Sequence, residues 1–427
     1  DYNLLLFKNI QLFLQINSKM IIMGKYLVAI VLSTLILHSC SMDNRDKIAQ
    51  DRLDQFFQEL YPADEPGAAV LILKGDKVMY DKGFGLADLN TKEKIDGNTF
   101  FNIASVSKQF TAVAMLKLAN EGKISLDDPV KKYFPHFKGE FYNNIKISHL
   151  LSHTSGIGDY RPRDNREFVL YATDEDCILY MENLEKLHFE PGTQYQYMNP
   201  TFQLCYSIIQ QVTGKSFEEY MRENIHLPAG MDQTLYFSPD KEIPNMAHGY
   251  IPVDESETLA ADSDRTPEAQ AAAKREQEKA PVIGSWREYD YGEETFFATK
   301  ADGGIYTSTH QFAKWEKALR NSLIIDLETL QLAHTEKIKV TGSTFSSYQN
   351  RPFTSYGYGW FIEANPDFTK RVYHTGDNGG FQIYAGRYPE SECLLLIFSN
   401  RNDYDRWQNV TKVDSILVDA GWIELDN

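Results

Sequence analysis

Three short motifs carry residue types that could perform chemistry together, and the first is Ser105-Val106-Ser107-Lys108. It opens a run whose apolar residues recur at helical spacing. A serine hydroxyl is a weak nucleophile at neutral pH, and a lysine three residues further on lies over the same helix face, within reach of it. A helix N-terminus also favours negative charge that develops there. Ser105 is therefore the candidate nucleophile and Lys108 its activating base, with Ser107 as a competing hydroxyl.

The second motif is Tyr197-Met198-Asn199. A tyrosine can shuttle protons if its pKa, about 10 when unperturbed, is lowered by adjacent cations. The amide of Asn199 offers both a donor and an acceptor, which could hold a substrate amide or the lysine. The same spacing recurs at residues 142–144 and 348–350, so this motif alone is unspecific.

The third motif is His374-Thr375-Gly376, at the end of an expected strand and followed by Asp377 and a glycine-rich turn. A strand edge can offer backbone N–H groups to an oxyanion, and glycine lets a substrate approach the backbone closely. His374 could add a cation or a hydrogen bond near the tyrosine. A tight turn with a surface histidine would explain this motif equally well if it stood alone.

The sequence predicts no metal site and no cofactor. His149 and His153 could share a helix face, but no third ligand is evident. The motifs of α/β-hydrolases, zincins and P-loop NTPases are absent. Nucleophilic catalysis by the three motifs needs only side chains and water.

The composition indicates a globular protein of 427 residues, 42% hydrophobic and 24% charged. The net charge of −17 would repel a phosphate backbone, so we expect no nucleic-acid partner. Four cysteines are too few for a disulfide scaffold. Beyond Cys40, we expect Cys177, Cys205 and Cys393 to be buried thiols.

Residues 1–40 are expected to be an export segment. Lys25 precedes an apolar run over 26–37, and Cys40 follows. The run is shorter than the roughly 20 residues of a membrane span, and it resembles a bacterial lipoprotein signal. We therefore expect lipidation at Cys40, a membrane anchor, and a location facing the bacterial periplasm or cell surface. The alternative is ordinary cleavage nearby, which would give an exported protein without a lipid.

The remaining chain, 41–427, reads as an α+β domain with strands at both ends and helices between them. The sheet part is expected over about 48–100 and 299–427, and the helical part is inserted over about 101–298. A polar stretch over 254–280 reads as a solvated insertion, with a lid over a site as the alternative. The expected elements are a helix over 47–60, a hairpin of 68–73 and 77–84, helices over 105–120 and 201–213, strands over 356–363, 371–375, 380–388 and 393–399, and a helix over 403–421.

Taken together and in this order, the three motifs resemble those of the serine penicillin-recognising enzymes. Their spacing looks like that of the class C β-lactamase branch, which includes D-Ala-D-Ala carboxypeptidase, D-aminopeptidase and esterase relatives. Three further stretches look like that branch as well: 149–156, 301–308 and 356–360. The resemblance covers about residues 50–400 and implies a β-lactamase/transpeptidase-like fold, an antiparallel sheet flanked by the terminal helices.

The resemblance also implies a role for each matching residue. Ser105 would be acylated, and Lys108 would activate it. Tyr197 would move protons to the leaving group and from the attacking water. Asn199 would position the substrate and the lysine, and the backbone N–H groups of Ser105 and Asp377 would form the oxyanion hole.

One departure bears on the substrate. With Thr375 and Gly376, His374 would bind substrate where β-lactamases of this branch carry lysine, and histidine is mostly neutral above pH ~6.5. The resemblance therefore implies an exported serine hydrolase acting on a D-amino-acid peptide, including peptidoglycan, or on an ester. The alternatives are a true β-lactamase and a non-catalytic protein that binds peptidoglycan or a partner.

Overall fold

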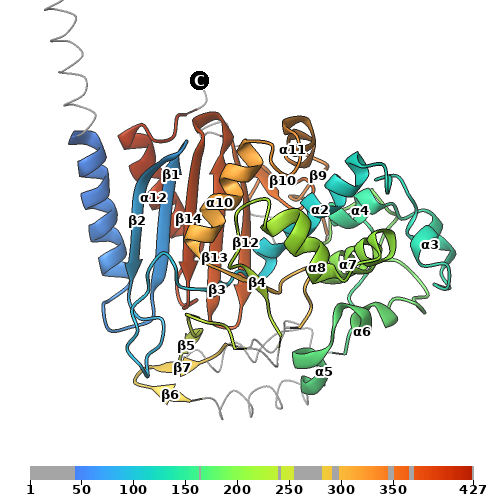
Figure 1. Cartoon of the computed structure of the whole chain (residues 1–427), viewed down its shortest axis with the longest axis horizontal. Coiled ribbons are helices and arrows are strands. Elements are labelled where there is room, and N and C mark those ends of the chain that lie inside the picture. Colours follow the sequence, from blue (N-terminus) through green and yellow to red (C-terminus); the bar gives the residue numbers. More distant parts are fainter. Residues whose placement is uncertain are drawn as a thin grey trace, which may run out of the picture. The chain divides into compact units, whose positions relative to one another are not determined.

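The strand Cys393–Ser399 (β14) is almost wholly apolar and is buried along its entire length. A strand that is apolar on both faces belongs in the middle of a covered sheet. In the computed structural model β14 lies between β1 (Ala68–Lys74) and β13 (Phe381–Tyr388). These strands belong to an eight-stranded antiparallel sheet in the order β2-β1-β14-β13-β12-β11-β10-β9 (Figure 1).

The structure describes residues 44–162, 165–238, 242–253, 281–290, 298–344, 351–364 and 370–425. The account below concerns the unit Gln55–Asn427. The chain is helical over residues 44–60. The expected export segment 1–40, with Cys40, and the insertion 254–280 lie outside the described residues, so both remain predictions.

The other strands of the large sheet are β2 (Lys77–Phe84), β9 (Ile338–Lys339), β10 (Thr354–Tyr356), β11 (Phe361–Glu363) and β12 (Arg371–Asn378). Two three-stranded sheets consist of β3 (Phe101–Asn102), β8 (Ile305–Thr307) and β4 (Leu235–Tyr236), and of β5 (Tyr250–Pro252), β7 (Trp286–Glu288) and β6 (Val282–Ile283).

The helices between and after the strands are mostly short. They are η1 (Ala104–Ser107), α2 (Lys108–Asn120), α3 (Val130–Tyr133), η2 (Glu140–Asn143), α4 (Ile147–Leu151), α5 (Arg166–Tyr171), α6 (Asp174–Leu179), α7 (Asn199–Thr213), α8 (Phe217–Met221), η3 (Arg222–His226), α10 (Thr309–Arg320), α11 (Leu327–Ala333), η6 (Pro389–Ser391) and α12 (Arg406–Ala420).

Helices cover both faces of the large sheet. On one face Phe312 of α10 meets Phe398 of β14 edge to face, with ring centroids 5.8 Å apart. On the other face Trp407 of α12 meets Tyr384 of β13 in the same way, at 6.1 Å. Aromatic burial of this kind stabilises both layers and excludes water from the strands.

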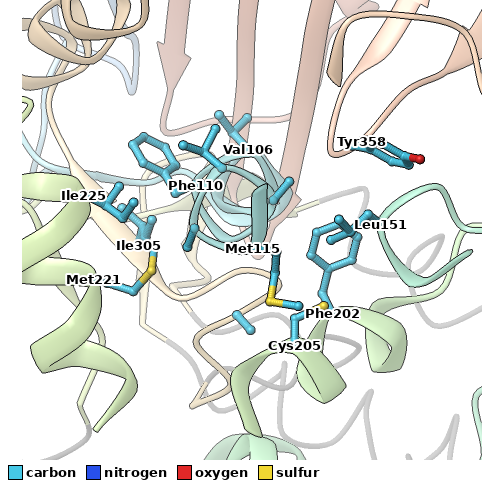
Figure 2. Packing of buried hydrophobic residues seen from close by; sticks show 14 of the residues in the cluster. Val106, Phe110, Met115, Leu151, Phe202, Cys205, Met221, Ile225, Ile305 and Tyr358 are labelled. Atoms are coloured by element: carbon cyan, nitrogen blue, oxygen red, sulfur yellow. The ribbon is translucent and has the colours of Figure 1, made fainter. Parts of the chain in front are cut away.

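Helix α2 is the centre of the helical half. Ten of its residues are buried, from Lys108 to Leu118, so apolar side chains surround it on all sides. Figure 2 shows Phe110 and Met115 of α2 among side chains from other segments, including Phe202 and Ile305. Because neighbours hold α2 all round, its N-terminal turn is a rigid platform for Ser105 and Lys108.

The structure confirms the α+β class, the hairpin of β1 and β2, the last three strands and the two terminal helices. Cys177, Cys205 and Cys393 are free and buried, as expected. Among the described residues, the structure contains no helix with the length and apolar character needed to cross a membrane.

Two expectations about elements are wrong. Residues 356–363 form parts of two paired strands, β10 and β11, because Gly359 adopts φ 82° and the chain turns back between them. The helix expected over 105–120 begins only at Lys108. Ser105 instead lies in the 3₁₀ turn η1, whose first residue, Ala104, has a φ of 44°.

An ion pair away from the three motifs makes folding sensitive to pH. Nδ1 of His248 lies 2.8 Å from Oδ2 of Asp290, and this hydrogen bond raises the pKa of His248 to about 9. The folded pKa exceeds the unfolded value of about 6.5. The pair therefore stabilises the fold fully below pH ~6.5, and its contribution is lost as the pH rises through about 9.

We expect Asp290→Asn to lower the free energy of unfolding by about 1–2 kcal/mol at pH 6 and by less at pH 10. Urea unfolding at each pH measures the difference. Asp81→Asn, which breaks the more exposed pair between His310 and Asp81, is the matched control and should cost less at pH 6. A loss that is the same at both pH values would contradict this role of His248.

Candidate active site

Ser105 and Lys108 are adjacent at the junction of η1 and α2. Nζ of Lys108 donates a hydrogen bond to Oγ of Ser105 at 3.0 Å. The strained Ala104 is held by its own N–H, which donates to Oδ1 of Asn102 at 2.7 Å. Strain of this kind persists only where its surroundings fix it, and here it presents the Ser105 hydroxyl to the lysine.

The Lys108 side chain is buried and has few polar partners. Nζ also donates to the backbone oxygen of Asp302 at 2.7 Å, and it lies 5.1 Å from the centroid of the Tyr197 ring. Burial lowers the pKa of Lys108 to about 7, partly offset by the charge of Asp302 and reinforced by Arg161. Near neutral pH both protonation states are therefore populated, as a general base requires.

The loop that supplies the Asp302 carbonyl is tied to α2 and η1. The Thr111 hydroxyl donates to the backbone oxygen of Ala301 at 2.7 Å. The N–H of Ile305 donates to Oγ of Ser107 at 3.3 Å. Ser107, the competing hydroxyl, thus has a structural partner, and Lys108 bonds to Ser105 instead.

Tyr197 and Asn199 sit where the chain enters α7. The Tyr197 ring lies beside Lys108 and is 6.2 Å from the ring of His374. No hydrogen bond joins Asn199 to Lys108, which bonds to Ser105 and Asp302. Oδ1 of Asn199 is buried without a partner among the described residues. The structure therefore lacks the expected contact by which Asn199 would position Lys108. The expected role of Asn199 in positioning the substrate stays a prediction.

The His374-Thr375-Gly376 motif lies within β12, beside η1. A Cβ on Gly376 would lie 2.3 Å from the backbone oxygen of Ile103, so only glycine lets the strand approach η1 this closely. The Asp377 side chain is exposed and forms an ion pair with Arg406 of α12. The oxyanion hole expected from the N–H groups of Ser105 and Asp377 stays a prediction.

His374 is buried and both ring nitrogens have partners. Nδ1 lies 2.7 Å from the backbone oxygen of Thr375, so this nitrogen carries the proton and donates. Nε2 then accepts from the Tyr356 hydroxyl at 3.0 Å. Burial lowers the pKa of His374 to about 3, with a further contribution from Lys108. His374 is thus a neutral hydrogen-bonding group and not the cation that the sequence also allowed.

His153 belongs to the site although sequence analysis gave it no role. It accepts from the backbone N–H of Met198 through Nδ1 at 3.2 Å, and its ring lies 4.3 Å from the Tyr197 ring. Burial and nearby Lys108 lower its pKa well below the usual value, so it is neutral. His153 lies after the end of α4, whereas His149 lies within it, so the two histidines do not share a helix face as the sequence had suggested. The sequence signal that could have pointed to His153 is the stretch 149–156, which resembles the class C β-lactamase branch.

A separate cluster offers possible metal ligands. In the described part of the chain, His248, Glu288 and Asp290 form the one such group, with ligand atoms within 4.8 Å of one another. Two of them, His248 and Asp290, form the ion pair described above, whose hydrogen bond already occupies Nδ1 of His248. They do not include any residue of the three motifs.

Comparison with known proteins identifies the family of this chain. The family model described as Beta-lactamase matches residues 53–413. The chain belongs to the Beta-lactamase family. Relatives of this fold are serine hydrolases, and we class the chain with them as an enzyme. The family accounts for the large antiparallel sheet.

Two curated proteins and one solved structure are similar to this chain. Penicillin-binding protein 4* of Bacillus subtilis (strain 168) is 26% identical over 364 residues, covering 82% of this chain and 72% of that protein. Protein flp of Staphylococcus aureus (strain N315) is 34% identical over 83% of this chain, which spans only 64% of that protein's length. The structure of a D-amino acid amidase from Ochrobactrum anthropi SV3 has a TM-score of 0.65 at 21% identity, covering 89% of this chain and 97% of that one, and shows the shared fold.

We expect His153→Ala to lower the free energy of unfolding by about 3 kcal/mol. The substitution empties a buried aromatic site and leaves the N–H of Met198 unpaired, and alanine disfavours the φ of 56° found here. Asparagine tolerates this φ and offers an acceptor, so His153→Asn should lose only about half as much. Urea unfolding of both variants is the measurement, and equal losses would contradict the role assigned to Nδ1.

Proposed function

We propose that this protein is a serine hydrolase that forms an acyl-enzyme on Ser105 with a D-amino-acid peptide, amide or ester. The single observation that supports this most is the 3.0 Å hydrogen bond between Ser105 and a buried Lys108 whose pKa is about 7. An amine tuned to neutral pH beside an otherwise weak nucleophile is the arrangement that nucleophilic catalysis needs.

The reaction follows from this pair. The neutral amine of Lys108 takes the hydroxyl proton of Ser105, and Oγ forms a bond to the substrate carbonyl carbon. The bond from that carbon to the leaving nitrogen or oxygen then breaks, and the leaving group takes the proton that Lys108 had accepted, passed on through Tyr197. A water molecule attacks the acyl carbon and gives its proton to Lys108 by the same route. The bond from that carbon to Oγ then breaks, Lys108 returns the proton to Ser105, and the acid is released. Backbone N–H groups of Ser105 and Asp377 would stabilise the oxyanion in both steps.

The relatives support the substrate class by their names alone. One is named a penicillin-binding protein and another a D-amino acid amidase, and the second name supports a D-amino-acid substrate for the proposed reaction. The export expected from residues 1–40 would bring the enzyme close to peptidoglycan. Rapid β-lactam hydrolysis is disfavoured because His374 is neutral and engaged, whereas a β-lactam carries a carboxylate.

We expect a fluorophosphonate to add covalently to the protein from Ser41 onward, and Ser105→Ala to abolish the adduct because the nucleophile is gone. Intact mass spectrometry reads out both. Ser107→Ala, which removes the competing hydroxyl and the hydrogen bond that it accepts from Ile305, is the matched control and should keep the adduct. No adduct on folded wild-type protein would overturn the acyl-enzyme and favour a binding protein.

The rate of Ser105 acylation should depend on the protonation of Lys108. We expect kcat/KM for an activated ester to rise with pH through about 7, because the amine must be neutral to accept the proton. Lys108→Met should lower kcat/KM by about 10²–10⁴-fold, the usual contribution of a general base. Stopped-flow measurements between pH 5 and 9 test this, and a profile flat across pH 7 would exclude Lys108 as the base.

A further inference from the structure

Asp302 contacts the lysine of the site and is itself almost fully buried. Its backbone oxygen accepts the hydrogen bond of 2.7 Å from Nζ of Lys108, and the residue is only 5% exposed. Covalent geometry separates the carbonyl oxygen and the carboxylate of one aspartate by roughly 3–5 Å, so the carboxylate lies within about 8 Å of the amine. A negative charge buried at that distance acts on the amine with little screening by solvent.

The Asp302 carboxylate has a neutral hydrogen-bond partner and no close cation. Nε2 of Gln203, which is buried in α7, donates to Oδ1 of Asp302 at 3.5 Å. Among the described residues Asp302 forms no ion pair. Its charge acts instead at longer range on two cations, Lys108 and Arg161.

Arg161 has a carboxylate of its own, and Lys108 does not. The guanidinium donates to Asp159 from Nε at 2.8 Å and from Nη2 at 2.6 Å. Asp302 is therefore the acidic group that bears on the protonation of Lys108, against the opposing charge of Arg161. The remaining titratable groups that face the amine are two neutral imidazoles and a phenol: His153, His374 and Tyr197.

The loop that carries Asp302 is held in place by Asp174 of α6. Oδ2 of Asp174 accepts from the N–H of Lys300 at 2.8 Å, and Oδ1 accepts from the N–H of Ala301 at 3.2 Å. Asp174 is fully buried, so water does not compete for these bonds. The Ala301 oxygen accepts from Thr111 of α2 at the same time. Because the loop is anchored on both sides, Asp302 keeps a fixed position relative to α2.

We propose that Asp302 is a positioning residue for the base of this site. Its backbone oxygen orients the amine of Lys108 toward Ser105, and its carboxylate sets the pH at which that amine can accept a proton. The inference rests on the proposed function, because it takes Lys108 as the base that activates Ser105. Without the negative charge, burial beside Arg161 would keep the amine neutral down to a lower pH and make it a weaker base.

Asp302→Asn removes the charge and keeps the backbone oxygen and the shape of the side chain. We expect the midpoint of the pH profile of kcat/KM for an activated ester to fall by about 1 pH unit, because the ammonium form loses its negative partner. Asp302→Glu keeps the charge and should keep a midpoint close to that of the wild type, even if kcat/KM itself is lower. Asp290→Asn, which removes a buried carboxylate outside the site, is the matched control and should not move the midpoint.

A second measurement observes Lys108 directly and needs no turnover. Protein labelled with carbon-13 at the ε carbon of lysine gives an NMR signal for each lysine, and the signal that is lost in Lys108→Met identifies Lys108. Its titration midpoint, expected at about 7 in the wild-type protein, should fall in Asp302→Asn as the kinetic midpoint does. Asp302→Ser, which is also neutral but smaller, replaces the asparagine variant if that variant does not fold, with the same expectation.

The outcomes separate this inference from the proposed function. Unchanged midpoints in the neutral variants, with the fluorophosphonate adduct on Ser105 still formed, would overturn this inference alone. The absence of that adduct from folded wild-type protein would overturn the proposed function. The NMR midpoints would then show separately whether Asp302 controls the protonation of Lys108.

Discussion

The burial of one amine, that of Lys108, is the constraint on which the rest of the site depends. Removing an ammonium group from water is unfavourable, and the protein offsets this only in part, with one carbonyl at 2.7 Å and the faces of two aromatic rings. The incomplete compensation is what brings its pKa to about 7. A fully paired lysine would stay protonated and could not accept a proton from Ser105.

The same charge controls the groups around it. His153 and His374 are both buried within range of Lys108, and its charge adds to burial in keeping them neutral. Each neutral imidazole then acts through a fixed tautomer. His153 accepts from the backbone before α7, and His374 accepts from Tyr356. The site therefore concentrates its proton chemistry on Lys108 and uses its histidines to hold Tyr197 and β12 in place.

The large sheet imposes the other constraint, because its strand β12 must pass very close to the turn η1 that carries Ser105. Gly376 removes the side chain that would collide with Ile103, and η1 meets β12 through backbone atoms. Helices on both faces of the sheet and a fully buried α2 keep this distance constant. Rigid packing around a strained turn is how a fold maintains the geometry of a reacting group.

The sequence alone determined the candidate site residues and many of the secondary-structure elements. Residue spacing identified Ser105 with Lys108, Tyr197 and His374, and alternation of apolar residues predicted the hairpin and the last three strands, because these are local properties of the chain. Only the tertiary structure decided that Ser105 lies in a 3₁₀ turn. It also decided that Lys108 donates to the backbone oxygen of Asp302 and not to Asn199, and that the Tyr356 hydroxyl donates to Nε2 of His374. Burial and hydrogen-bond partners come from segments far apart in the chain, and they set the pKa values of Lys108 and His374, which no local pattern encodes.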